Sequence, residues 1–384
     1  MFRPSGRGAA ALLGAAILTS LTACGAAPEE DSADAGGKVK AGSTASASDF
    51  GGMKELVAAA EKEGKLNVIA LPPDWANYGE VIKAFEKKYP KIKVNSENPD
   101  ASSSDEIAAV KSRKGQKRAP DVLDLGIAFA RSAAEEGLFA PYKVEAWDDI
   151  PESQKDADGR YYNDYGGYVS IGCDAKRIKK CPETFADLLK PEYKGKVALN
   201  GNPTKSGSAF GGVYAASLAN KGSFGDIKPG IDFFAKLKKS GNFIPVESTP
   251  ATVEKGETPI SIDWDYLNAG YADQFKDKGV DWQVAVPSDG VYAQYYSQAI
   301  NKEAPNPAAA RLWMEFLYSP EGQNLWLKGY ARPVLLPAMT EDGTADKDFA
   351  TKLPEVEGTP EFPASDELDK AQEDLAENWD KALS

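Results

Sequence analysis

Short apolar segments alternate with amphipathic segments from residue 53 onward, and this alternation constrains the fold more than any other feature of the chain. Residues 66–71 form an apolar run that is typical of a strand. In residues 78–89 apolar side chains recur at helical spacing, and Pro90 ends the segment. The same signals predict further strands at 91–96, 121–125, 167–172, 196–200 and 259–263, and helices at 53–63, 103–114, 128–137, 182–189, 209–220, 231–239 and 364–384. Strands that alternate with helices predict an α/β fold with mainly parallel sheets.

The chain of 384 residues is longer than one hydrophobic core usually supports, so we expect two domains. In α/β sheets, ligands bind beyond the carboxyl ends of the strands, where loops and helix N-termini meet. The loops at 72–78, 100–105 and 126–129 each follow a predicted strand. We therefore expect binding residues in these loops.

The N-terminal residues have the pattern of a bacterial secretory signal. Arg3 and Arg7 precede an apolar run over residues 9–21, which is too short to span a bilayer. The run ends in Leu-Thr-Ala-Cys, which is similar to a lipobox, so we expect cleavage before Cys24 and acylation of its thiol. The acyl chains would hold the protein on the extracytoplasmic face of the cell membrane. Residues 24–49 are rich in Ala, Gly, Ser and acidic residues and predict a flexible linker.

Charge and histidine content exclude several classes of function. The net charge of −13 argues against a nucleic-acid partner, whose phosphates need clustered Lys and Arg. It is compatible with a cationic ligand and equally with the solubility of a secreted protein. The chain has no histidine, which excludes Ser-His-Asp and Cys-His catalysis and histidine zinc sites. Cys173 and Cys181 remain besides Cys24, and outside the cytoplasm we expect them to form a disulfide.

An acidic and aromatic cluster directly follows the strand predicted at 259–263. It consists of Asp263, Trp264, Asp265 and Tyr266. Two carboxylates beside aromatic faces would attract a cation, so we expect these residues to bind the ligand. The alternative is a helix start, in which one aspartate is the N-cap and the aromatic side chains belong to the core.

Two more groups of aromatic residues are candidates for ligand binding. Asp74 and Trp75 lie in the proline-led loop after the first predicted strand, where we expect contact with the ligand. Tyr295 and Tyr296 are neighbours in a predicted strand. Because successive side chains of a strand point to opposite faces, one of the two should face the ligand and the other the core, and the sequence does not say which.

Hydroxyl groups gather at the start of two predicted helices. The turn before residues 209–220 contains Thr204, Ser206, Gly207 and Ser208. Free backbone N–H groups at such a helix start favour an anionic group, although ordinary capping also explains one serine. Ser103 and Ser104 begin the helix at 103–114, and Ser103 with Glu106 has the spacing of a capping box. Capping and ligand hydrogen bonds are both open for this pair.

Several phrases of the chain resemble the bacterial extracellular solute-binding proteins of the type 2 periplasmic class, in the branch of ferric, polyamine, thiamine and aminophosphonate binders. They span nearly the whole chain after the linker. The phrases are LVAAAEKEGKLNV from Leu56, VIKAFEKKYPKIKV from Val81, TFADLLKPEYKGKVAL from Thr184, NPTKSGSAF from Asn202 and APNPAAARLWMEFLYSPEGQ from Ala304.

The resemblance implies a two-lobed α/β fold, in which each lobe has a mixed, mainly parallel sheet flanked by helices and strands cross at the hinge. The ligand would lie in the cleft, which closes on binding. The hydroxyl-rich turn from Thr204 to Ser208 matches a turn that holds anionic groups in the family. We expect this order of parts: signal peptide 1–23, acylated cysteine and linker 24–49, lobe 1 at 50–168 plus 288–345, and lobe 2 at 169–287 plus 346–384.

The resemblance also implies a function in transport rather than catalysis. We expect a monomeric substrate-binding lipoprotein that delivers a small cationic or zwitterionic organic solute, similar to a polyamine, thiamine or an aminophosphonate, to an ABC transporter permease without a cofactor or bound metal. One alternative is ferric-ion transport, but ferric binders have an adjacent tyrosine pair where this chain has Tyr266 and Leu267. A further alternative is an extracellular hydrolase that uses paired carboxylates, or a ligand sensor.

Overall fold

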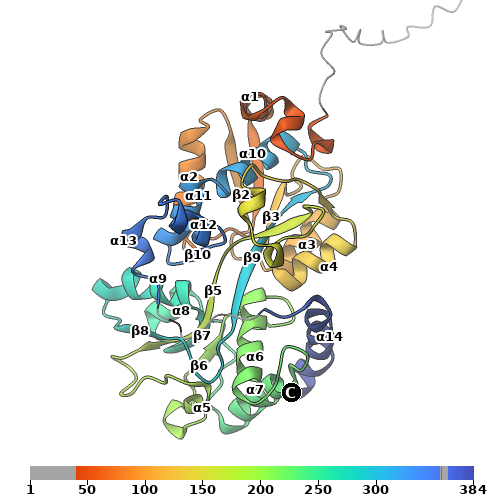
Figure 1. Ribbon diagram of the computed structural model, residues 1–384. Helices are drawn as coiled ribbons and strands as arrows, with labels where there is room; N and C mark the ends of the chain where they lie inside the picture. The colour runs from red at the N-terminus through yellow and green to blue at the C-terminus, as the bar shows by residue number, and fades with distance from the viewer. Residues whose placement is uncertain (1–39, 355, 357–361) are drawn as a thin grey trace, which may run out of the picture. The chain divides into compact units, whose positions relative to one another are not determined.

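The computed structural model describes residues 40–354, 356 and 362–384, and Figure 1 shows their arrangement. The predicted signal peptide and the predicted acylation site at Cys24 lie outside the described residues. Within the part of the chain that is described, every helix is too short or too polar to cross a membrane.

Two long strands organise the sheets. β5 (Tyr161–Asp174) pairs over its first half with β9 (Ala293–Asn301) and over its second half with β7 (Ile260–Trp264) and β8 (Trp282–Ala285). The resulting strand order is β3-β9-β5-β7-β6. In Figure 1, β5 and β9 run from the group of elements around β3 and α10 to the group around β6 and α6.

The sheets are mixed, as predicted, but the expected parallel majority needs correction. Among the described strands, the two parallel pairs are β1 (Lys65–Ile69) with β2 (Lys93–Glu97), and β6 (Val197–Leu199) with β7. β3 (Val122–Gly126), β4 (Phe139–Ala140) and β10 (Arg332–Pro333) pair antiparallel with β9 or β5. The local strand-helix pattern does not reveal a strand that returns from the far end of the chain and inserts antiparallel.

Helices cover both groups of strands. The helices that precede or follow β1 to β3 are α1 (Met53–Glu63), α2 (Tyr78–Lys88), α3 (Ser103–Ser112) and α4 (Ile127–Glu135), and those that follow β9 are α10 (Pro307–Leu317) and α11 (Pro320–Lys328). The remainder are α5 (Phe185–Leu188), α6 (Gly207–Ala219), α7 (Lys228–Ser240), α8 (Pro250–Lys255), α9 (Asp265–Phe275), α12 (Leu336–Glu341), α13 (Lys347–Ala350) and α14 (Ser365–Ala382). The ring of Phe85 on α2 packs edge-on against Trp313 of α10 at 5.1 Å between centroids, which shows how the helices share one apolar core.

Residues 41–49, which the sequence assigned to the flexible linker, instead include the short 3-10 helix Ala41–Ser43 and most of a second one, Ala47–Phe50, and they pack on the protein. Ala47 and Phe50 are buried, and the Arg311 Nε donates to the Thr44 carbonyl at 3.0 Å. The predicted linker therefore includes a folded segment at its end, because two apolar side chains suffice to fix a short stretch of small residues.

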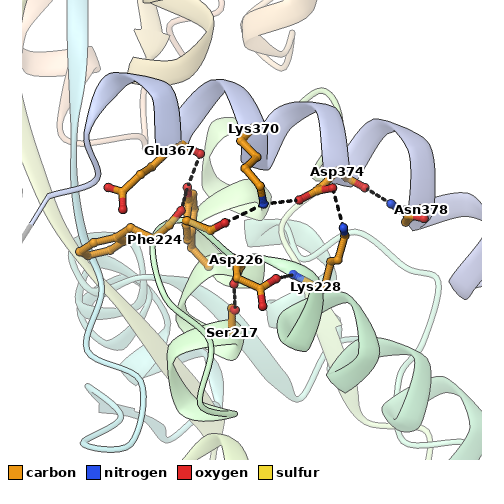
Figure 2. A network of polar contacts seen from close by, with 10 residues as sticks. Ser217, Phe224, Asp226, Lys228, Glu367, Lys370, Asp374 and Asn378 are labelled. Atoms are coloured by element: carbon orange, nitrogen blue, oxygen red, sulfur yellow. Dashed lines mark hydrogen bonds and ion pairs between the residues drawn. The ribbon is translucent and has the colours of Figure 1, made fainter.

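The C-terminal helix α14 matches its prediction. Leu368, Ala371, Leu375 and Trp379 are buried. Figure 2 shows the polar contacts beside this apolar side, where Asp374 joins Lys370 at 3.0 Å and Lys228 of α7 at 3.1 Å. The helix thus docks on α7 through one apolar stripe and one cluster of ion pairs.

The predicted disulfide is confirmed. Cys173 near the end of β5 is bonded to Cys181, eight residues further along the chain, with 5.8 Å between their Cα atoms. The bond closes the loop that leaves β5.

Candidate functional site

A cavity of about 250 Å³ lies where loops from both groups of strands meet. Its wall comes from the loop after β1, the loop after β2 with the start of α3, the start of α6, residues 247–250 and α9. Asn200 after β6, Asp124 of β3 and Tyr296 of β9 complete it. Two of the three predicted loops therefore contribute. The third begins at Gly126, where the backbone instead packs so closely against Gly207 that a Cβ atom would lie 2.9 Å from the Gly207 Cα.

Carboxyl groups dominate the charge of this cavity. Asp74, Asp100, Glu106, Asp124 and Glu247 line it, and the described lining residues include neither lysine nor arginine. Asp74, Asp100 and Glu247 are exposed, whereas Glu106 and Asp124 are buried. A cavity with one sign of charge concentrates ligands of the opposite sign, so this one favours cations.

Aromatic rings form one wall of the cavity. Trp75 and Tyr296 meet edge to face at 5.5 Å between centroids. Tyr165 lies behind them, stacked on Tyr296 at 5.7 Å, and its hydroxyl accepts from the Trp75 Nε1 at 2.7 Å. This hydrogen bond fixes the indole, whose face can then contact a cation or an apolar part of a ligand.

The inner end of the cavity contains Asp124 and Glu106. The Tyr165 hydroxyl donates to Asp124 Oδ2 at 2.7 Å, and the Asp124 backbone N–H donates to Glu106 Oε2 at 3.1 Å. Burial raises the pKa of Asp124 to about 7 and raises the pKa of Glu106 well above its usual value. Sequence reasoning predicted neither residue as part of the site. For Asp124 a signal was present, because an acidic residue inside a predicted apolar strand is rarely buried unless it has a special role.

Of the residues predicted in the first loops, some line the cavity and others only support its wall. Asp74, Trp75 and Ser103 line the cavity. Ser104 does not, and its hydroxyl pairs with that of Ser102 at 3.0 Å. Ser102 rather than Ser103 is the N-cap of α3, with a capping-box partner in Asp105, so the predicted capping box was one residue out of register. The Ser103 hydroxyl accepts from the Gly126 N–H at 3.2 Å.

In the predicted turn before α6, too, some residues line the cavity and others do not. Ser206 and Gly207 line the cavity, and Ser206 is the N-cap of the helix, accepting from the Ala209 N–H at 3.3 Å. Thr204 and Ser208 lie outside the lining. The Thr204 hydroxyl donates to Asn202 Oδ1 at 2.8 Å, and the Ser208 hydroxyl donates to Asp263 Oδ1 at 2.7 Å.

The acidic and aromatic cluster at the end of β7 and the start of α9 lies behind the cavity wall rather than on it. Asp263 accepts from Ser208, from the Asn200 Nδ2 at 2.7 Å and from the Trp264 N–H at 2.8 Å, and burial raises its pKa to about 7. Trp264 and Tyr266 are 1% exposed. The Tyr266 ring contacts Trp75 edge to face at 6.1 Å, so this cluster supports the aromatic wall.

Asp265 begins α9, which agrees with the alternative of a helix start, although Trp264 occupies the N-cap position. Its carboxylate forms a buried ion pair with Arg332 and accepts from the Tyr168 N–H at 3.0 Å. Burial is the largest influence on its pKa and raises it, while Arg332 acts in the opposite direction. These contacts occupy both oxygens of Asp265 and keep it out of the cavity lining.

The tyrosine pair of β9 follows the strand alternation. Tyr296 lines the cavity, whereas Tyr295 lies near Phe362, with 6.0 Å between ring centroids.

In the described part of the chain, no three His, Cys, Asp or Glu side chains are arranged to hold a metal ion.

Comparisons with known proteins agree with this geometry. Residues 117–355 match the family described as bacterial extracellular solute-binding protein. An uncharacterized protein of Haemophilus influenzae is 28% identical over 221 residues, covering 54% of this chain and 61% of that protein. A putative 2-aminoethylphosphonate-binding periplasmic protein of Salmonella paratyphi A is 27% identical over 207 residues, covering 53% of this chain and 58% of that protein. The match thus spans about three fifths of the length of these relatives.

A solved structure shows the same fold. The periplasmic binding protein AfuA from Actinobacillus pleuropneumoniae, with fructose-6-phosphate bound, superposes with a TM-score of 0.64 at 22% identity and covers 82% of this chain and 99% of that one. The family description and the name of the Salmonella relative are those of binding proteins. The chain therefore belongs to the bacterial extracellular solute-binding proteins and has the two-lobed fold of the periplasmic binding proteins.

Proposed function

We propose that this protein is the substrate-binding component of an ABC import system and that it captures a small organic cation or zwitterion in the cavity. The observation that carries the proposal is the lining itself, in which the described residues contribute five carboxyl groups and no basic side chain. A cavity of about 250 Å³ suits a compact solute, since pockets for drug-sized ligands begin at roughly 300 Å³.

The same lining opposes a strongly anionic ligand. Relatives of this chain include a sulfate-binding protein of Escherichia coli and the putative 2-aminoethylphosphonate-binding protein. Sulfate would meet the carboxyl groups without a basic partner, whereas a zwitterion could place its amine near them. Its anionic end would find Ser206 and Gly207 at the start of α6, where backbone N–H groups favour negative charge.

Membrane attachment and lobe closure belong to the same proposal. The signal pattern and Cys24 support a lipid anchor on the extracytoplasmic face, and the family supports a permease as the partner. We place lobe 1 at 50–168 plus 288–345 and lobe 2 at 169–287 plus 346–384, as the sequence suggested. The paths of β5 and β9 support crossovers in these regions.

Isothermal titration calorimetry with a charge-sorted panel tests the proposed ligand class. The panel contains putrescine, spermidine, thiamine and 2-aminoethylphosphonate, with sulfate, fructose-6-phosphate and ferric citrate as contrasts. We expect at least one compound with a cationic nitrogen to bind, without being consumed, and the simple anions to give no heat. Preferential binding of sulfate, the sugar phosphate or iron would contradict the proposal.

A further inference from the structure

The inner end of the cavity contains a buried oxygen atom that lacks a hydrogen bond. Asp124 Oδ2 accepts from Tyr165, but Asp124 Oδ1 makes no hydrogen bond of good geometry among the described residues, although the side chains of Tyr78 and Gln298 lie close enough to lower the pKa of the carboxyl. Asp124 is only 5% exposed and yet lines the cavity. A buried acceptor without a donor is destabilising, so this atom indicates where a ligand group belongs.

The surroundings of this oxygen indicate the chemistry of that group. Glu106 is 1% exposed, lines the same end of the cavity and is held by the Asp124 N–H. A cation at the closed end would favour the ionised forms of these two carboxyl groups, and the lone pairs of Oδ1 can accept from an N–H or O–H donor. Trp75 and Tyr296 lie along the wall, where they can contact the apolar part of the ligand.

We infer that the inner end of the cavity is a subsite for a protonated primary or secondary amine, whose N–H donates to Asp124 Oδ1 beside Glu106. This inference rests on the proposed function and narrows its ligand class. A quaternary ammonium has the same charge but no N–H, so it would leave Oδ1 without a donor. The subsite therefore selects amines over fully methylated cations.

The groups that face Asp124 from the elements packed around it are acids and phenols. They are Glu106 of α3, Tyr78 of α2, Asp164 and Tyr165 of β5, and Tyr296 of β9. Burial raises the pKa of Asp124 to about 7, and an amine cation beside it would lower that pKa. Binding then releases a proton to solvent near pH 7, and affinity falls as the pH drops from 7 to 5 because the carboxyl must first lose its proton.

Calorimetry on the full chain tests the subsite with defined probes. The amines are putrescine, spermidine and 2-aminoethylphosphonate, and the quaternary cations are choline and tetramethylammonium. We expect an amine to bind and the quaternary cations to bind at least tenfold more weakly. Asp124→Asn should lower the affinity for the amine about thirtyfold, the size expected for a hydrogen bond to a charged group. It should also reduce the proton release, measured in buffers of different ionisation enthalpy.

Asp164→Asn is the matched control. Asp164 is another fully buried carboxyl next to Asp124, also with one unbonded oxygen among the described residues, but it is not part of the cavity lining. Its replacement removes no contact with the ligand, so it should weaken amine binding far less than Asp124→Asn does.

Two outcomes would overturn the inference in distinguishable ways. If the wild type binds an amine, but Asp124→Asn binds it equally well or the wild type prefers a quaternary cation, the subsite is wrong and the proposed function stands. If no cation binds the wild type, the proposed function fails together with the subsite. If Asp124→Asn does not fold, the wild type alone still tests the subsite. Binding of an amine at pH 7 without release of a proton would then contradict it.

Discussion

At the scale of single residues, the protein keeps several carboxyl groups in places where water cannot reach them. Asp263 is 2% exposed and accepts hydrogen bonds from Ser208, Asn200 and the Trp264 N–H. These bonds favour the ionised form, but burial outweighs them and raises the pKa to about 7. The folded protein therefore holds this proton more tightly than the unfolded chain does.

That difference makes stability depend on pH in a defined direction. Between about pH 4 and pH 7 the folded state keeps the Asp263 proton and the unfolded state does not, so the free energy of unfolding falls as the pH rises. Asp263→Asn removes this contribution and should make the slope shallower by up to about 1.4 kcal/mol per pH unit. Urea unfolding at several pH values measures it. An unchanged slope would show that Asp263 is ionised in the folded protein throughout this range.

The residues of the site were only partly predictable from the sequence. Asp74, Trp75, Ser103, Ser206, Gly207 and one of the two tyrosines line the cavity, because loops after strands and helix starts are where α/β sheets bind ligands. The cluster from Asp263 to Tyr266 looked equally suitable, yet it lies one layer behind the wall. Asp124, in contrast, lines the cavity but was not predicted to do so. Its position in an apolar strand concealed that the end of this strand faces the cavity. Which of these side chains reaches the cavity depends on how strands from distant parts of the chain pair. Local sequence patterns do not reveal that pairing.

At the scale of elements, α14 shows how a terminal segment is held. Its four buried residues face α7 and its neighbours, and the Trp379 ring lies 5.4 Å from Phe234 between centroids. Beside them, Lys370 donates to the Gly225 carbonyl at 2.7 Å and Asp374 pairs with Lys228 (Figure 2). The apolar contacts carry most of the stabilisation, because exposed ion pairs contribute little.

Trp379→Ala should therefore lower the free energy of unfolding by about 3 kcal/mol, through the cavity that it leaves against Phe234. Glu377→Ala is the control, since Glu377 is exposed on the same helix and its loss should cost less than about 0.5 kcal/mol. Chemical denaturation measures both values. Equal effects of the two variants would contradict the packing described for α14.

Elements with strong local signals were predicted well, and long-range pairings were not. Helix α1 ends at Glu63, as predicted, because Gly64 adopts a left-handed conformation with φ of 68° at its end. Strand β5, predicted for residues 167–172, extends from Tyr161 to Asp174. Its first half lacks a simple alternation because it is buried on both sides and pairs with β9 from far along the chain.

At the scale of the whole described chain, a few contacts join the two proposed lobes. Arg131 of α4, in proposed lobe 1, donates to Asp369 of α14, in proposed lobe 2, at 2.9 Å. The Tyr330 hydroxyl similarly bonds to Asp273 of α9. Contacts of this kind would be lost if the lobes separated.

Arg131→Gln should therefore shift the ligand-free protein toward an open arrangement. We expect a larger radius of gyration in small-angle X-ray scattering without ligand, and up to about fivefold weaker ligand binding, since an ion pair of this exposure contributes at most about 1 kcal/mol. Arg113→Gln is a matched control, because Arg113 is equally exposed but pairs with Glu97 within proposed lobe 1. The same radius for both variants with and without ligand would argue against lobe closure.

The account as a whole depends on a small organic cation being the natural ligand of the cavity. Native mass spectrometry of the protein, purified from its host and then incubated with a metabolite extract of that host, tests this most directly. The account predicts a bound compound of low mass that contains at least one amine nitrogen and is lost at low pH. Recovery of sulfate, a sugar phosphate or a ferric ion instead, or a protein that takes up nothing from the extract, would contradict it.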